Sequence, residues 1–294
     1  MSVTADLIRL DADESLGPDH VHRYARTRRF LVAWTRAAPD GGPVSVTSEE
    51  EYFLLLPDVP AEVGWDINGT AGDTDRGAVA RSVLAPASSV VIVPAGMTTV
   101  RLEGAGRFIR LFAPAVAGLG AATTESITEI RTSADLLPLF PGFSRRSTGP
   151  LVYKLDDLPN SPGMPRAKLF QSATMSINWV EYQGPRDRTS LSPHAHQNFE
   201  QGSLALEGQF IHHFRSPWGR DASQWRDDEH VKADRNSLAI IPPTLVHTTE
   251  GVGPGRHILI DIFAPPRRDF IAKRQILNAA DYVDALPLAL AEID

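Results

Sequence analysis

The sequence predicts an all-β protein built as a sandwich or barrel. Runs of five to nine residues, such as SVVIVP, RFIRLF and HILIDIF, are rich in β-branched and aromatic side chains and are bounded by Gly, Pro or Asp. The 294 residues include 22 glycines and 23 prolines, which favours many turns over long helices. Short strands with regular turn punctuation are typical of sandwiches and barrels.

An internal repeat indicates two related β domains. Residues 88–114 and 237–265 each contain a β-branched run, a Pro turn, a Gly-rich break and a second run ending in Phe-Ala-Pro. Residues 49–58 align with residues 200–209 at nearly the same offset, and this alignment matches Glu51 with Gln201. Two similar segments in the same order suggest a duplication. The expected divisions are an N-terminal barrel at 1–125, a linker at 126–167, a C-terminal barrel at 168–267 and a helical tail at 268–294.

The segments outside the two barrels are predicted from simpler signals. Prolines are frequent in 126–167, which suggests a linker that wraps one of the barrels. In the tail, Phe270, Ile271, Ile276 and Leu277 have helical spacing, so we expect one or two short C-terminal helices.

Composition and charge restrict the functions that the chain can have. The absence of cysteine excludes disulfides, thiol nucleophiles and cysteine-held metals, so any metal must be bound by His, carboxylate, amide or water. A net charge of −7 without a basic block argues against a nucleic-acid partner. The first residues lack the apolar stretch of a signal peptide, and no apolar run is long enough to span a bilayer, so we expect no membrane association and a cytoplasmic location.

Histidines in the second half are spaced like metal ligands. His194 and His196 are two residues apart, so both side chains of an extended segment point to the same face. A third imidazole is available from His247, in IIPPTLVHTT, and Glu200 and Gln201 are both near enough in sequence to provide a further ligand. The pattern predicts one divalent metal ion, and nitrogen and oxygen ligands suit Fe, Mn, Ni, Zn or Cu.

These residues resemble the motifs of the cupin superfamily. The first cupin motif reads His-x-His, three or four residues, Glu or Gln, six residues and Gly; here Gly208 closes it, and a four-residue spacer after His196 selects Gln201. Glu200 fits a three-residue spacer and is then the alternative ligand or a general base. The second motif ends at His247, with Thr244 where the family usually has Gly. The resemblance implies two tandem cupin jelly-roll barrels with a metal site of His194, His196, Gln201 and His247.

The corresponding N-terminal positions have lost these side chains. Val44-Ser45-Val46 stand where His-x-His is expected, Thr99 stands against His247, and Glu51 is the one ligand type retained. The resemblance therefore implies a degenerate, metal-free N-terminal barrel.

Three residues near the predicted ligands are candidates for catalysis. Besides Glu200, alternation along FIHHF directs either His212 or His213 inward. Asp261 either orients a ligand histidine or the substrate, or forms a structural pair with His257 or an arginine.

Neutral ligands leave the full charge of a divalent ion uncompensated, which favours a small oxygenated or anionic substrate and Lewis-acid chemistry of an isomerase, lyase or cyclase. An Fe(II)-dependent dioxygenase is the alternative for the same ligands, and a non-catalytic small-molecule-binding protein is the alternative from another class. Free sheet edges also permit a homodimer.

Overall fold

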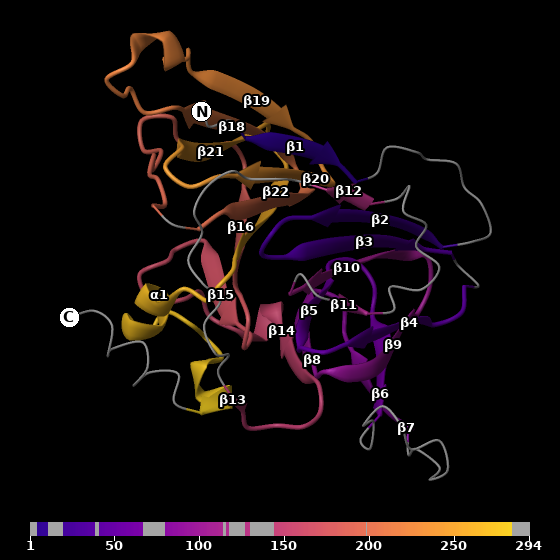
Figure 1. Cartoon of the computed structure of the whole chain (residues 1–294). Helices are drawn as coiled ribbons and strands as arrows, with labels where there is room; N and C mark the ends of the chain where they lie inside the picture. Colours follow the sequence, from indigo (N-terminus) through magenta and orange to yellow (C-terminus); the bar gives the residue numbers. More distant parts are fainter. Residues whose placement is uncertain are drawn as a thin grey trace.

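The computed structural model describes residues 5–10, 20–38, 41–66, 80–113, 116–117, 127–129, 144–197 and 199–283. Strands dominate these ranges, so the predicted all-β class is confirmed (Figure 1). Within them, no helix has both the length and the apolar character needed to cross a bilayer.

The N-terminal half of the described chain forms two antiparallel-rich sheets that face each other. The larger has the order β12-β2-β3-β10-β5-β8-β14, and the smaller has the order β11-β4-β9-β6-β7. Their bounds are β2 Val21–Arg26, β3 Leu31–Ala37, β4 Val44–Ser48, β5 Tyr52–Leu56, β6 Ala61–Asp66, β7 Ala80–Ala85, β8 Ser89–Val93, β9 Gly96–Leu102, β10 Gly106–Phe112, β11 Val116–Ala117, β12 Ile127–Glu129 and β14 Leu151–Lys154.

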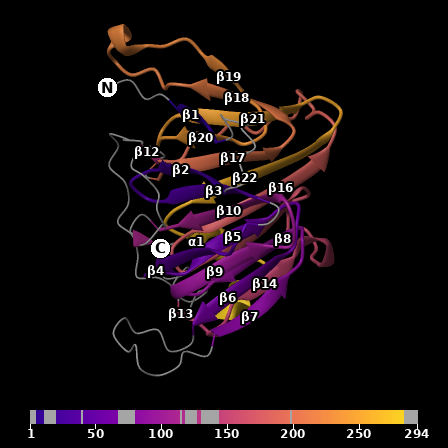
Figure 2. The same ribbon diagram turned by 90° about the vertical axis from the view of Figure 1, so that its right-hand side faces the viewer.

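The C-terminal half repeats this plan with a six-stranded sheet, β1-β20-β17-β22-β16-β15, facing a three-stranded sheet, β19-β18-β21. Figure 2 shows the strands of the two halves stacked one above the other. The bounds are β1 Asp6–Arg9, β15 Ala167–Gln171, β16 Ser176–Gln183, β17 Gln201–Glu207, β18 Gln209–Arg215, β19 Glu229–Ala233, β20 Ser237–Ile241, β21 Val246–Val252 and β22 Arg256–Phe263.

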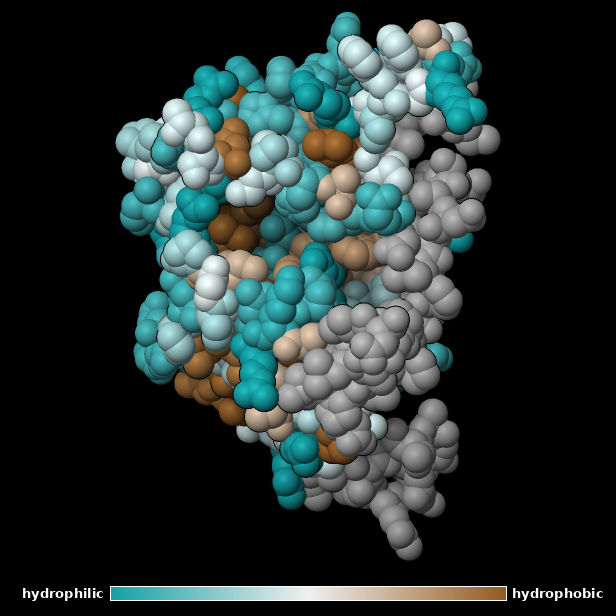
Figure 3. All heavy atoms as spheres, turned by 90° about the vertical axis from the view of Figure 1, so that its left-hand side faces the viewer, coloured by the Kyte–Doolittle hydropathy of each residue, from teal (hydrophilic) through white to brown (hydrophobic). Residues whose placement is uncertain are grey.

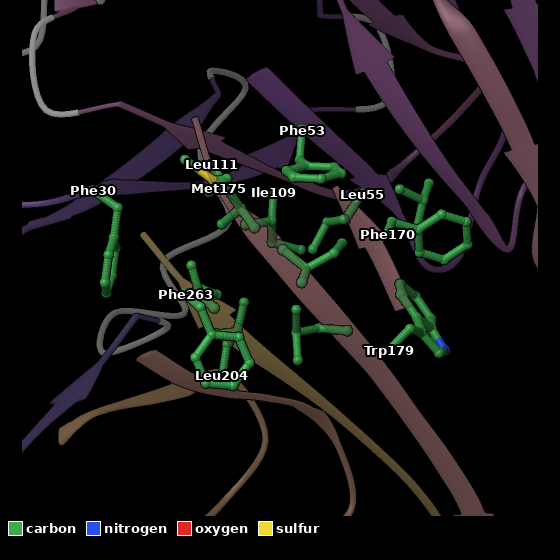
Figure 4. Packing of buried hydrophobic residues seen from close by; sticks show 14 of the residues in the cluster. Phe30, Phe53, Leu55, Ile109, Leu111, Phe170, Met175, Trp179, Leu204 and Phe263 are labelled. Atoms are coloured by element: carbon green, nitrogen blue, oxygen red, sulfur yellow. The ribbon is translucent and has the colours of Figure 1, made fainter. Parts of the chain in front are cut away.

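The largest apolar core lies between the two large sheets. Along β10, Ile109 and Leu111 point to this core, whereas Phe108 and Phe112 point into the N-terminal barrel. Side chains alternate along a strand, so the two faces of β10 contact two different cores. Both faces are therefore buried, and the sequence of the strand is a nearly continuous apolar run. Figure 4 shows side chains of both halves packed together, among them Phe30, Phe53, Ile109, Phe170, Trp179 and Leu204.

A strand near the N-terminus and a strand of the linker extend the two large sheets. Strand β1 is the edge strand of the C-terminal sheet, with Asp6 opposite Ile240, and β14 extends the N-terminal sheet, with Leu151 opposite Ile92. The linker residues 130–143 and the tail residues 284–294 lie outside the described residues. The short helices are α1 Arg268–Ala272 and the 3-10 turns η2 Leu155–Asp157, η3 Ala222–Gln224 and η4 Ala279–Asp281, and β13 Ser144–Arg145 pairs with β23 Tyr282–Val283.

The strand pairing changes the alignment of the two halves by one residue. Tyr52 pairs with Val93 in the N-terminal half as Gln201 pairs with Ile241 in the C-terminal half, so Tyr52 occupies the position of Gln201. The expectation that Glu51 corresponds to Gln201 is therefore wrong. A slip of one residue moves a side chain to the opposite face, and Glu51 indeed faces away from the N-terminal barrel interior, with its Oε1 accepting a hydrogen bond from Tyr282 at 2.7 Å.

Candidate metal centre

Three histidines from two separate segments meet at one end of the C-terminal barrel. The backbones of His194 and His247 pair, with N–O distances of 3.0 and 2.8 Å. One nitrogen from each ring of His194, His196 and His247 lies within 4.8 Å of the others. His247 is buried and 3% exposed, whereas His194 is exposed, so the group lies where the barrel interior meets its surface.

The turn before His247 places Thr244 in a backbone conformation that favours glycine. Thr244 has φ of 69°, in the left-handed region, and its N–H donates to the carbonyl oxygen of His196 at 2.6 Å. A threonine in this region is strained, because its branched side chain crowds the backbone. The departure from the motif at Thr244 thus leaves the turn intact, and the turn ties the His194–His196 segment to the strand that carries His247.

Gln201, at the start of β17, faces the three histidines. Its Oε1 lies 2.9 Å from His196 Nε2 and 3.2 Å from His247 Nε2. Its Nε2 donates to Asp261 Oδ1 at 2.9 Å, and Asp261 also accepts a hydrogen bond from the Ser203 hydroxyl at 2.5 Å. A flipped amide would place two oxygens in contact, so the Asp261 carboxylate fixes the amide with its oxygen towards the histidines.

The hydrogen bonds of the rings also fix their tautomers. The Nδ1 of His194 lies 2.9 Å from the carbonyl oxygen of Ser192, and the Nδ1 of His247 lies 2.9 Å from that of Leu245. A carbonyl only accepts, so each Nδ1 carries a proton, and in the neutral form of either ring the lone pair is on Nε2. Metal-binding histidines are held in the same way.

This arrangement fits a cation. Burial lowers the pKa of His247 to about 4, although the Leu245 carbonyl opposes the shift, so the ring is neutral near pH 7. The lone pair of its Nε2 then faces the lone pairs of Gln201 Oε1 at 3.2 Å, a repulsive contact that a cation between the two atoms makes attractive. Burial also lowers the pKa of His196 to about 3. The four side chains offer three neutral nitrogens and one neutral oxygen, which is a suitable donor set for a divalent transition metal.

Glu200 and Gln201 lie on opposite sides of the strand. A Cβ on Gly202, two residues along from Glu200, would lie 2.9 Å from the Phe30 ring of the N-terminal half. Glu200 is fully buried, and its charge acts on Arg29, whose pKa is lowered mainly by burial, with Arg28 adding to the shift and Glu200 opposing it. The geometry therefore gives no support to Glu200 as a metal ligand or a general base.

His212, on β18, is the inward-facing member of the pair, and His213 faces outward towards Glu250. The Nδ1 of His212 lies 2.8 Å from Thr249 Oγ1, and its buried Nε2 has no hydrogen-bond partner within the described chain. Burial is also the main cause that lowers the pKa of His212 to about 4. Asn178 on β16 pairs with Asp261 on β22, and its buried Oδ1 likewise has no hydrogen-bond partner among the described residues. The barrel interior thus holds neutral polar atoms that suit an oxygenated ligand.

Two residues near the site, Ser203 and Arg267, were not predicted from the sequence. Ser203 is the second donor to Asp261, and its position two residues after Gln201 is the signal that would have revealed it. Arg267, in FAPPRRDF, lies with its guanidinium 4.0 Å from the Phe270 ring centroid and is paired with Asp269. Its charge contributes to lowering the pKa of His196. Asp261 pairs with Gln201 and Ser203 rather than with His257, which stacks on Tyr182.

The loop that carries His194 lies at the left of Figure 1, in red-orange. Figure 3 shows the molecule from that side. The surface is largely hydrophilic, and apolar atoms are visible in a hollow near its middle.

Solved structures with similar folds include oxalate decarboxylases. The enzyme from Lactobacillus farciminis in complex with formate matches over 91% of this chain and 90% of its own, with a TM-score of 0.59 and 12% identity. A variant of the Bacillus subtilis enzyme matches over 90% of this chain and 80% of its own, with a TM-score of 0.58 and 11% identity. No family model and no curated protein matches the chain. At these identities the likeness concerns the fold, and it confirms that the chain has the cupin jelly-roll fold.

Proposed function

We propose that the chain is a metal-dependent enzyme whose C-terminal barrel binds one divalent ion through His194, His196, His247 and Gln201. The observation that carries the proposal is the 3.2 Å contact between His247 Nε2 and Gln201 Oε1. Neither atom has a proton to donate to the other, because the His247 ring donates from Nδ1 to Leu245 and the Gln201 amide donates from Nε2 to Asp261. The fold of the oxalate decarboxylases is consistent with such a site but does not specify its reaction.

The proposed reaction is a lyase-type cleavage of a small carboxylate. A divalent ion in this site would act as a Lewis acid towards substrate oxygens, and its charge is undiminished by the four neutral ligands. Asp261 holds the Gln201 amide in place, and the neutral His212 imidazole presents Nε2 to the barrel interior, where it can form a hydrogen bond with bound substrate. His212 and Asp261 are thus a candidate proton-transfer residue and a positioning residue, respectively.

The experiment combines metal analysis with a substrate panel. Purified protein should contain about one divalent ion per chain, and His194→Ala and His247→Ala should each lose it. Metal-loaded protein is then incubated with oxalate, malonate, 2-oxo acids and 2-hydroxy acids while CO2 and O2 are followed together. CO2 release without stoichiometric O2 uptake is expected. Uptake of one O2 per turnover would indicate the dioxygenase instead, and full metal content in His247→Ala would refute the site.

A further inference from the structure

The N-terminal barrel contains a fully buried cation. Arg110, on β10, is 0% exposed, and its Nε, Nη1 and Nη2 atoms have no hydrogen-bond partner among the described residues. Its neighbours along the strand, Phe108 and Phe112, belong to the interior core of this barrel, and alternation directs Arg110 to the same side. Both rings lie beside the guanidinium, with centroids 5.4 and 5.6 Å from Cζ.

The surroundings of Arg110 include no described acidic partner that would neutralise it. The groups whose charge or dipole acts on it are the hydroxyls of Tyr24 and Tyr52 and the imidazole of His22. Tyr24 on β2 and Arg110 on β10 both pair with Ala33 on β3, which lies between them. The small side chain of Ala33 leaves room for the two long side chains to approach each other. A guanidinium does not lose its proton in proteins, and an isolated charge is costly to bury, so a buried arginine calls for an anion.

Strand pairing places Arg110 at the position that Asp261 has in the other barrel. Arg110 pairs with Leu54, two residues after Tyr52, as Asp261 pairs with Ser203, two residues after Gln201. Where the C-terminal barrel has its ligand amide, the N-terminal barrel has the Tyr52 hydroxyl, 2.9 Å from Thr98 Oγ1. The chemistry at this position is therefore inverted between the barrels: an acidic side chain stands beside the candidate cation site in one, and a basic guanidinium stands in the other.

We infer that the N-terminal barrel binds a small carboxylate, with Arg110 as its anchor. The planar guanidinium presents paired N–H groups that match the two oxygens of a carboxylate, and its three buried nitrogens have no hydrogen-bond partner among the described residues. The Tyr52 and Thr98 hydroxyls supply further polar partners within the same interior. This site lies in the opposite barrel from the proposed metal centre and does not depend on it.

The test uses acetate as the probe and removes the metal centre first. The full chain carrying His194→Ala and His247→Ala is freed of metal, and its thermal unfolding and acetate binding by calorimetry are measured at constant ionic strength, with chloride replacing acetate. Acetate is expected to bind and to raise the unfolding temperature. Adding Arg110→Met should weaken binding roughly 10- to 100-fold, the size of a lost charge-assisted contact. Arg101→Met is the matched control, because Arg101 is an exposed arginine of the same barrel, and binding should be unchanged.

A second variant and a spectroscopic readout keep the result decisive. Arg110→Lys retains the charge and loses the paired geometry, so it should bind acetate more weakly than the parent even if the methionine variant does not fold. The His22 imidazole, 3.0 Å from Thr35 Oγ1 in the same interior, should shift its NMR resonance on acetate binding in the parent only. Equal acetate binding in the parent and Arg110→Lys, or no acetate binding by the parent, would overturn the inference.

Discussion

At the scale of single residues, the effect of Asp261 on metal affinity should depend on Gln201. The hydrogen bonds described between Asp261 and the candidate site go to the Gln201 amide and the Ser203 hydroxyl, and the charge of His194 also acts on Asp261, so we expect its main effect on a metal ion to pass through Gln201. Asp261→Ala is expected to weaken metal affinity about 10- to 100-fold, the range typical of second-sphere partners, and Gln201→Ala, which removes a proposed ligand, should weaken it at least as much. The double variant should be little worse than Gln201→Ala alone.

Metal titration by calorimetry measures this coupling. Glu200→Gln is the control, because Glu200 lies next to Gln201 in sequence but on the other face of the strand, and it should bind metal as the parent does. Additive losses in the double variant would show that Asp261 acts on the metal by a route other than Gln201.

At the scale of elements, the turn between β17 and β18 requires glycine. Gly208 has φ of 90°, and a Cβ there would lie 2.7 Å from a ring carbon of His257 and 2.8 Å from the Arg256 carbonyl oxygen. Gly208→Ala should therefore reduce the free energy of unfolding by about 1–3 kcal/mol. Gly255→Ala, where a Cβ would meet nothing within 4 Å, should change it much less. Urea denaturation of the two variants compares them directly, and equal stability would contradict the close contact.

The same element shows what the sequence could predict. The motif spacing predicted that His194, His196, Gln201 and His247 lie together, and strand alternation predicted that one of His212 and His213 faces inward without deciding which, because period-two patterns and short spacers are local properties. The partner of Asp261 could not be predicted, since it depends on which strand lies beside β22 in space. The one-residue misalignment of Glu51 has a related cause: neighbouring polar residues Glu50 and Glu51 carry no signal of register, which strand pairing alone fixes.

At the scale of the whole molecule, a buried histidine links stability to pH. Burial, with a smaller contribution from the charge of Arg110, lowers the pKa of His22 from its ordinary value of 6.5 to about 4. Between these values the unfolded chain binds more protons than the folded chain, so the stabilising contribution is complete above pH 6.5 and is lost as the pH falls through about 4. Urea denaturation of metal-free protein at intervals from pH 7.5 to 4 should show this fall. His22→Phe should reduce its slope, and an unchanged slope would exclude His22 as its source.

The pairing of β1 with β20 has a consequence for how the molecule is made. Residues 6–9 are synthesised before residues 237–240, with which they pair. Strand β1 must therefore remain without its native partner until β20 has been made. A cut between the two barrels would separate β1 from the sheet that contains β17 and leave the edge strand β20 unpaired, so the barrels are not modules that such a cut can separate.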